Sequence, residues 1–315
     1  MRMKLFVTGI TGFIGSHFGR MALTAGHDVV GLARQSDTRN ISRIEDYQAL
    51  SRFRLVYGDL TADISGLLEG AEAVVNFAAR TFVDHSILDP EPFIQSNIVG
   101  TYKLLEQARK YKPKLYVQVS TDEVYGAILD GAYKEDARLN PTNPYSSTKA
   151  AADMLCVSYW NTYKLPIIIT RTENNYGPWQ HPQKAIPVFV AKALKGEKLP
   201  VYGDGKHRRM WLHVEDHCAA ILHLLEHGNA GEIYHVAGEE ELENIELAKH
   251  VLDILGKPHS LISFVPDHDV RPGHDRRYAL DVTKLRATGW KPSHALREGL
   301  EETVMWYKNH PEWHV

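Results

Sequence analysis

Residues 4–15 of the chain read KLFVTGITGFIG, and this segment is the strongest indication of the fold class. The apolar run Lys4–Thr8 has strand character and passes at once into Gly9, Gly12 and Gly15, at the opening of a helical stretch. In such a turn the first glycine permits the tight bend, the second lets backbone approach a pyrophosphate, and the third lets the helix pack closely on the strand. The helix amino terminus then faces the phosphates. The glycine spacing alone is weak, but its place in a strand-turn-helix unit predicts dinucleotide binding.

Short apolar runs then alternate with helical stretches through the first two-thirds of the chain, which is typical of parallel strand-helix-strand units. Runs such as VVNFAA and YVQVS show little alternation, as expected of strands covered on both faces. We therefore expect an α/β fold with a Rossmann-type, doubly wound parallel sheet. The expected strands are Lys4–Thr8, Asp28–Leu32, Arg54–Tyr57, Ala73–Phe77, Leu115–Ser120 and Pro166–Arg171.

After about Asn174 the pattern becomes irregular, with Pro178, Pro182 and Pro187 close together. A helix-like DHCAAILHLLEHG and a terminal helical stretch follow. We expect a dinucleotide-binding domain over residues 1–173 and a smaller α/β substrate-binding domain mainly over 174–315, with some C-terminal segments returning to the sheet. Two such lobes would share a cleft.

Composition excludes several classes of function. Lys and Arg total 36 against 39 for Asp and Glu, so the net charge of -3 gives no general reason to expect nucleic acid or membrane as a partner. The two cysteines, Cys156 and Cys218, lack metal-type spacing and fit a reducing compartment, so no metal site is expected. No apolar stretch reaches the roughly 18 residues of a membrane helix, and the N-terminus reads as a buried strand. We expect a soluble cytoplasmic protein.

The end of the second strand bears on the choice of cofactor, because an acidic residue there takes the adenosine ribose hydroxyls whereas an Arg accommodates a 2′-phosphate. Residues 29–40 read VVGLARQSDTRN, with Ala33 at the expected acidic position and Arg34 after it. This favours NADP over NAD. An exposed Arg34 on a loop, with Asp37 supplying a carboxylate from a longer reach, is the alternative. Asp59, just after a strand, is placed to accept a hydrogen bond from the adenine amino group.

Tyr145 and Lys149 form a Y-x-x-x-K pair in NPYSSTKAAADML, where residues four apart share one helix face. A neighbouring cation favours the phenolate, so Lys149 is expected to lower the pKa of Tyr145 toward a value useful for base catalysis. This spacing is also common on surface helices. The upstream glycine loop favours the functional interpretation.

Asp122 and Glu123 lie in STDEVYG, residues 120–126, directly after a strand. Their side chains should emerge at the carboxyl edge of the sheet, where doubly wound folds bind ligands. Two carboxyl groups pushed together in a cleft divide into one that keeps its proton and one that does not, which supplies an acid and a base. An exposed acidic turn is the alternative.

At these residues the sequence resembles the extended short-chain dehydrogenases, and most closely the dTDP-glucose 4,6-dehydratases. The resemblance runs over nearly the whole chain, and its selective segments are TDEVYG and RPGHDRRYA. The others are TGITGFIGS, NFAARTFVDHSI, SNIVGTYKLLE, NPYSSTKA, NNYGPWQHPQKAIP and YGDGKHRRMWLHVEDH.

The resemblance implies a reaction on a nucleotide-linked hexose with a tightly bound, recycled NAD or NADP. Tyr145 takes the 4-hydroxyl proton while hydride leaves C4, with Thr121 as a hydrogen-bonding helper and Lys149 tuning the phenol. Glu123 then removes the C5 proton, Asp122 protonates the departing 6-hydroxyl, and the hydride returns to C6. Eliminating water needs both a base and an acid within reach of one ring.

The binding residues expected from the motifs and the resemblance form two sets. The cofactor set is Gly9, Gly12, Phe13, Ile14, Gly15, Arg34, Asp59, Leu60, Ala78, Ala79, Asn97, Tyr145 and Lys149. The substrate set is Thr81, Asn174, Lys184, Tyr202, Arg209, Asn244, Arg271 and His274. Lysine and arginine suit a pyrophosphate, which arginine engages with paired hydrogen bonds.

Three residues depart from the family pattern: Phe82 replaces a usual His, Glu173 a small residue, and Met210 an Asp. The ARQS segment resembles the NADP-using GDP-mannose 4,6-dehydratases. A nucleotide-sugar epimerase or decarboxylase, using the same Tyr145 oxidation without elimination, is the alternative that the Asp122–Glu123 pair argues against. A non-catalytic dinucleotide-sensing protein is the third hypothesis, though it has no need of an intact Thr-Tyr-Lys set. A homodimer through two sheet-flanking helices is expected by resemblance.

Overall fold

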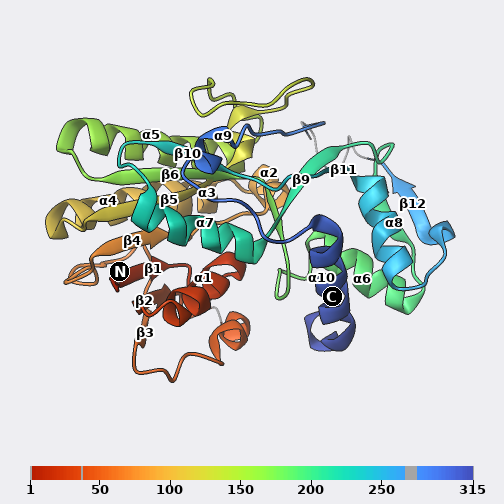
Figure 1. The fold of residues 1–315 in the computed structure, drawn as a ribbon, viewed down its shortest axis with the longest axis horizontal. Coiled ribbons are helices and arrows are strands. Elements are labelled where there is room, and N and C mark those ends of the chain that lie inside the picture. Colours follow the sequence, from red (N-terminus) through yellow and green to blue (C-terminus); the bar gives the residue numbers. More distant parts are fainter. Residues whose placement is uncertain (1, 37, 267–274, 315) are drawn as a thin grey trace.

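The computed structural model describes residues 2–36, 38–266 and 275–314. Its centre is a sheet of seven parallel strands in the order β10-β6-β5-β4-β1-β2-β3 (Figure 1). The strands are β1 Lys4–Thr8, β2 Asp28–Ala33, β3 Phe53–Tyr57, β4 Ala73–Asn76, β5 Leu115–Thr121, β6 Ile167–Thr172 and β10 Ile233–Val236. The first six are the strands expected from the sequence, with bounds that differ by at most one residue at either end. The prediction of a Rossmann-type, doubly wound fold is confirmed.

The strand order reverses beside β1. From β1 the chain proceeds through β2 and β3 toward one edge, then returns to β4 on the other side of β1 and continues through β5, β6 and β10. Ligands of such sheets bind in the crevice at the carboxyl ends of the strands, at this reversal point. The topology therefore places any dinucleotide beside the loop that follows β1.

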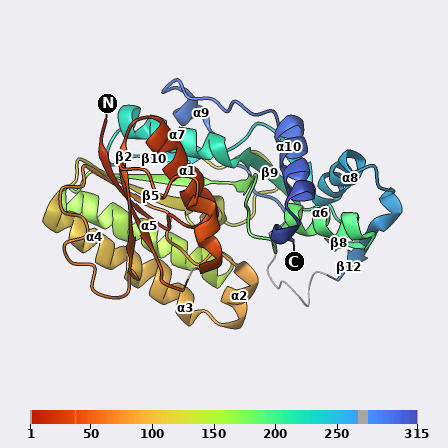
Figure 2. The ribbon, with the colours of Figure 1, turned by 90° about the horizontal axis from the view of Figure 1, so that it is seen from below.

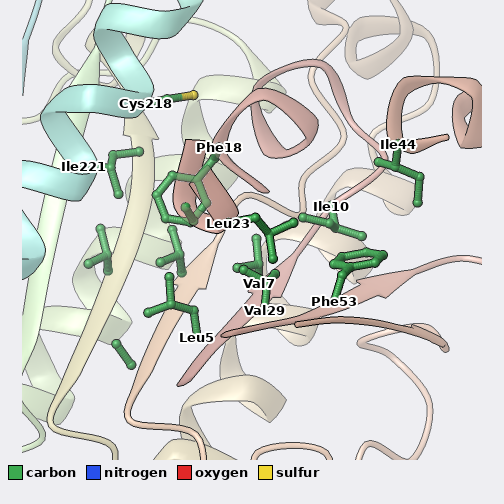
Figure 3. Close-up of a cluster of buried hydrophobic side chains, with 14 of the residues drawn as sticks. Leu5, Val7, Ile10, Phe18, Leu23, Val29, Ile44, Phe53, Cys218 and Ile221 are labelled. Carbon is green, nitrogen blue, oxygen red and sulfur yellow. The ribbon is translucent and has the colours of Figure 1, made fainter. Parts of the chain in front are cut away.

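Helices cover both faces of the sheet. α1 (Phe13–Thr24) and α7 (Val214–His227) pack together on one face, and α4 (Gly100–Tyr111) and α5 (Pro144–Tyr163) lie on the other (Figure 2). Alternate residues of β1 serve the two cores: Leu5 and Val7 join Phe18 and Ile221 on the first face (Figure 3), whereas Phe6 packs with the second. This two-sided burial explains why the strand lacks a polar face.

The later part of the chain builds a smaller lobe beside the sheet, with its own hydrophobic core (Figure 1). This core lies among α6 (Ala185–Lys195), α8 (Asn244–Ile254) and α10 (Leu296–Asn309). Two small sheets complete the lobe: β11-β9-β7 and the parallel pair β12-β8. Their strands are β7 Asn174–Tyr176, β8 Leu199–Tyr202, β9 Arg208–His213, β11 Glu241–Glu243 and β12 Ile262–Val265.

The chain crosses between the lobes more than once. Both α7 and β10 follow residue 174, yet α7 packs on the large sheet and β10 is one of its strands. Short helices fill the remaining connections: α2 Val83–Leu88, α3 Glu91–Phe93 and α9 Thr283–Arg286. In the described part of the chain, no helix has both the length and the apolar character that a membrane crossing requires.

Candidate active site

A cavity of about 610 Å³ opens at the carboxyl ends of β1, β4 and β5 and extends to the smaller lobe. Most of the residues expected to bind ligand line this one cavity. They are Gly9, Gly12, Phe13, Ile14, Gly15, Arg34, Asp59, Leu60, Ala78, Ala79, Thr81, Thr121, Asp122, Glu123, Tyr145, Lys149, Asn174, Lys184, Tyr202, Arg209 and Asn244.

The glycine loop has the geometry that the sequence predicted. Gly9 adopts a φ of +66°, and a Cβ placed there would lie 2.9 Å from the Ala78 backbone nitrogen. A Cβ on Gly15 would lie 2.2 Å from the Gly9 carbonyl oxygen. The loop thus brings bare backbone and the start of α1 to the cavity, which fits the pyrophosphate of a nicotinamide dinucleotide.

Beyond this loop the cavity continues past Arg34 and Asp59. One Asp59 oxygen accepts hydrogen bonds from the backbone and hydroxyl of Thr61, at 2.8 and 2.7 Å. Arg43, which no sequence pattern singled out, also lines this part of the cavity. Its buried guanidinium donates to the carbonyl oxygens of Thr11, at 3.1 Å, and Trp179, at 2.9 Å, and so ties the glycine loop to the smaller lobe. Asp37 lies outside the described residues.

Asn97 is the described member of the cofactor set that does not line the cavity. Its side chain accepts from the Arg80 backbone nitrogen at 2.8 Å and donates to the Arg80 carbonyl oxygen and the Thr148 hydroxyl, at 3.1 and 2.9 Å. Asn97 is buried behind the wall, where it fixes the loop after β4 to α5. The structure therefore gives it a supporting position.

Helix α5 presents Tyr145 and Lys149 to the cavity, and its start is fixed by a capping box. The Asn143 side chain accepts from the Ser146 backbone nitrogen at 2.9 Å, and the Ser146 hydroxyl accepts from the Asn143 backbone nitrogen at 3.2 Å. The Lys149 ammonium donates to the carbonyl oxygen of Val119, at 2.6 Å. These bonds hold the helix against the end of β5.

Thr121 ends β5, Asp122 and Glu123 follow it directly, and all three line the same cavity. The Thr121 hydroxyl donates to Asp122 Oδ1 at 2.9 Å, and it accepts from the Glu123 backbone nitrogen at 3.3 Å. Asn143, another residue that the sequence did not select, donates to Glu123 Oε2 at 3.4 Å. Both carboxyl groups and the phenol of Tyr145 thus open onto one space, as the dehydration chemistry requires.

Burial shifts the pKa values of both carboxyl groups upward. It raises the pKa of Asp122 to about 7, and the Glu123 charge adds to that rise. It also raises the pKa of Glu123, against a hydrogen bond from Asn143. The charges of Arg209 and Lys184 further oppose the rise at Glu123. Asp122 is therefore suited to hold a proton near neutral pH.

The sequence analysis predicted a lowered pKa for Tyr145, and this prediction is wrong for this structure. Burial raises the pKa of the phenol above its ordinary value, and the charge of Glu123 adds to the rise. Burial likewise lowers the pKa of Lys149, although the Asp153 charge opposes it. Removing both groups from water outweighs the favourable effect expected of a nearby cation.

The substrate end is lined by residues from the smaller lobe and from the loop after β4. The Arg209 guanidinium donates to the Asp275 carbonyl oxygen at 2.8 Å and stacks 4.5 Å from the centre of the Tyr278 ring. The Lys184 ammonium lies 4.4 Å from the centre of the Phe82 ring. These two cations give this end of the cavity a positive character suited to phosphate. Arg271 and His274 lie outside the described residues.

The three departures from the family pattern lie at or near the site. Phe82 lines the cavity, stacked on His85 with ring centres 5.0 Å apart. Glu173 lines it too, buried at the end of β6. Met210 is partly buried on β9 and packs against the cluster that contains Val124. Two of the three departures therefore change the surface that a ligand meets.

Comparisons with known proteins agree with this geometry. Residues 6–303 match the family model described as GDP-mannose 4,6 dehydratase. A dTDP-glucose 4,6-dehydratase of Streptomyces niveus is 42% identical, over 99% of this chain and 94% of that protein. The structure of DesIV (dTDP-glucose 4,6-dehydratase) from Streptomyces venezuelae, with NAD and TYD bound, matches with a TM-score of 0.94 at 42% identity, over 99% of each chain.

A UDP-glucuronic acid 4-epimerase from Bacillus cereus, in complex with UDP-glucuronic acid and NAD, matches at 29% identity with a TM-score of 0.92. This match covers 98% of the present chain and 99% of the epimerase. The fold is thus common to dehydratases and epimerases, whereas the higher identity is to a dehydratase. Because the family model spans nearly its whole length, the chain belongs to the GDP-mannose 4,6 dehydratase family, the nucleotide-sugar 4,6-dehydratases of the extended short-chain dehydrogenase class.

Proposed function

We propose that this protein converts a nucleoside-diphosphate hexose into the 4-keto-6-deoxy sugar, with loss of water across C5 and C6. The observation that carries the proposal is a single cavity lined by a phenol, two adjacent carboxyl groups and the glycine loop. Lys184 and Arg209 at its far end fit the diphosphate. The relatives' names make dTDP-glucose the first substrate to test.

The described residues divide the chemistry among themselves. Tyr145 takes the proton of the sugar 4-hydroxyl, with Thr121 beside it and Lys149 holding the end of β5. Glu123 removes the C5 proton, which the new 4-keto group makes acidic, and later returns a proton to C5. Asp122 gives its proton to the 6-hydroxyl, which leaves as water. The bound dinucleotide supplies a hydride acceptor and donor and, when oxidised, a positive charge that would favour the phenolate form of Tyr145.

An assay with several nucleotide hexoses tests the proposal. The purified protein should convert at least one of them to a 4-keto-6-deoxy product, detected by mass and by the ultraviolet absorbance of the sugar enone in alkali. A C4 epimer or a decarboxylated product would instead identify the alternative enzymes. Cofactor binding without any sugar conversion would favour a dinucleotide-sensing protein.

Within this function we infer a preference for NADP, supported by Ala33 in place of an acid and by Arg34 in the cavity wall. Arg34→Ala should weaken NADP binding by about tenfold or more, because a charge-assisted bond to the 2′-phosphate is lost, and should change NAD binding little. Titration of both cofactors by calorimetry measures this, with the exposed Arg54→Ala as the control for net charge. Equal losses for the two cofactors would refute the preference.

We also infer that the protein is a homodimer and works in the cytoplasm. Tyr102 on α4 and Met154 on α5 are 47% and 46% exposed, and such apolar side chains on neighbouring helices support a helix-to-helix interface. The two thiols are free and buried, which is compatible with a reducing compartment. Fractionation of the source cells tests the location.

A further inference from the structure

Glu173 lies beside Asp122 because of strand register. β5 and β6 pair in parallel, with Thr121 opposite Thr172, so Asp122 and Glu173 are the next residues of the two strands' continuations. Both side chains line the cavity and are almost wholly buried, at 3% and 4% exposure. Glu173 therefore adds a third carboxyl group to the cavity, next to Asp122 and Glu123.

Each of the two carboxyl groups is only half satisfied. Glu173 Oε1 accepts from the Leu280 backbone nitrogen at 2.8 Å, and Asp122 Oδ1 accepts from Thr121. Glu173 Oε2 and Asp122 Oδ2 are buried and have no hydrogen-bond partner within residues 2–36, 38–266 and 275–314. Buried polar atoms without partners are rare in native proteins and generally have a reason. One hydrogen bond between these two oxygens would satisfy both.

Such a bond needs a proton on one of the two oxygens, and the surroundings of Glu173 favour its protonated form. Burial raises the pKa of Glu173 well above its ordinary value, and the charge of Asp122 adds to that rise. The other charged groups that face Glu173 are Glu241, Arg209 and Arg277. Glu241 is itself paired with Arg277 at 2.6 Å, so these two charges largely offset each other. In the protonated form that this shift favours, Glu173 has a hydroxyl to donate.

We propose that Glu173 is a positioning residue, which donates a hydrogen bond to the carboxylate that Asp122 becomes when it gives its proton to the departing hydroxyl. The inference rests on the proposed dehydration. The O–H bond of Asp122 breaks, the proton leaves with the 6-hydroxyl as water, and Glu173 keeps its own proton throughout. A donor to the charged form stabilises that form, so Glu173 makes Asp122 a better acid at the moment of elimination.

Two substitutions of Glu173 test whether its hydrogen-bond donor matters to the reaction. Glu173→Gln keeps the shape, the neutral charge and an N–H donor, so kcat should stay within about fivefold of wild type. Glu173→Ala removes the donor, so kcat should fall about 10- to 100-fold with little change in KM. Loss of the donor also disfavours ionised Asp122, so the alkaline limb of the kcat–pH profile should move to higher pH in Glu173→Ala and stay in place in Glu173→Gln. A purely structural role would not move this limb.

Infrared spectroscopy provides a readout that needs no turnover. Above pH 7, where Asp122 ionises, wild type should retain the C=O band of one buried carboxylic acid, and Glu173→Gln should lack it. A limb that moves to lower pH in both variants would mean that Glu173 is charged, and would overturn the proposal. So would equal kcat losses in the two variants with no shift of the limb. Wild-type protein that makes no 4-keto-6-deoxy product would instead overturn the function on which the inference rests.

Discussion

Asp122 and Glu123 are adjacent carboxyl groups with different surroundings, and the difference assigns their roles. Burial and the Glu123 charge raise the pKa of Asp122 to about 7, against the hydrogen bond from the Thr121 hydroxyl and the charge of Arg209. Burial also raises the pKa of Glu123, but the Asn143 amide and the charges of Arg209 and Lys184 oppose that rise and favour the ionised form. Environments that push two pKa values apart identify the acid and the base.

Glu123→Gln tests the assignment of the base. The variant should lose about 100-fold or more in exchange of the C5 hydrogen with deuterated solvent, because an amide cannot accept that proton. Cofactor binding should not change. Asp122→Asn is the matched control and should retain C5 exchange while losing water elimination. Exchange at the wild-type rate in Glu123→Gln would remove Glu123 as the base.

The raised pKa of Asp122 also predicts how stability depends on pH. The folded protein binds this proton more tightly than the unfolded chain does, so stability is lost as pH rises from about 4 to about 7. Asp122→Asn removes this loss. The substitution should therefore increase the free energy of unfolding at pH 8 by on the order of a few kcal/mol more than at pH 5, with a correspondingly larger rise in Tm at pH 8. Differential scanning calorimetry at both pH values, with the exposed Asp130→Asn as control, measures it. A larger gain at pH 5 would contradict the sign.

Sequence patterns located most of the site but not how its groups are satisfied. Asp122 directly follows a strand, and parallel strands bring such positions to one edge, whereas Tyr145 and Lys149 share one helix face through their four-residue spacing. Arg43 was not predicted as a site residue, because its position depends on a contact with Trp179, which lies far along the chain. The prediction of a lowered pKa for Tyr145 was wrong, because a four-residue spacing does not reveal how deeply a side chain is buried.

Among the elements, the turn from β1 into α1 tolerates the least change. A Cβ on Gly15 meets the backbone oxygen of Gly9 at 2.2 Å, and backbone cannot move aside as a flexible side chain can. Gly15→Ala should therefore displace α1, destabilise the fold by about 1–3 kcal/mol and abolish cofactor binding. Gly12→Ala, whose Cβ would lie 3.0 Å from the same oxygen, is the milder comparison. Thermal unfolding and cofactor titration measure both, and equal effects would contradict the argument.

The strands divide by how easily they could be predicted. Five of the six expected strands are buried along nearly their whole length and are rich in apolar residues, whereas the edge strand β3 is largely exposed or half-buried. β10, Ile233–Val236, was not predicted, because it has only four residues and includes the polar His235. The His235 ring nitrogen Nε2 lies within hydrogen-bond distance of the Tyr125 hydroxyl, at 2.7 Å. β9 begins with two arginines, Arg208 and Arg209, whose partners lie in other segments. Such strands depend on tertiary contacts that local patterns do not contain.

In the proposed function, the two lobes would contribute different parts of the site. The large sheet carries the glycine loop, Tyr145 and the adjacent carboxyl groups of Asp122 and Glu123, whereas the smaller lobe carries Lys184 and Arg209. A nucleotide hexose held between them would place its diphosphate on the smaller lobe and its ring at the ends of β4 and β5. Because α7 and β10 return to the sheet, the lobes are joined by several chain crossings and not by one hinge.

The outer side of α4 and α5 gives the last prediction, which concerns assembly. Tyr102 and Met154 are exposed there and would be buried against the same helices of a second copy. Replacing both with Glu places unpaired charges in that interface, so the dissociation constant of the dimer should rise at least about 100-fold. Light scattering after size exclusion should show dimeric wild type and a monomeric double variant with unchanged circular dichroism. Phe264→Ser on β12, 55% exposed in the smaller lobe, should stay dimeric, and its dissociation would show that the α4–α5 face is not the interface.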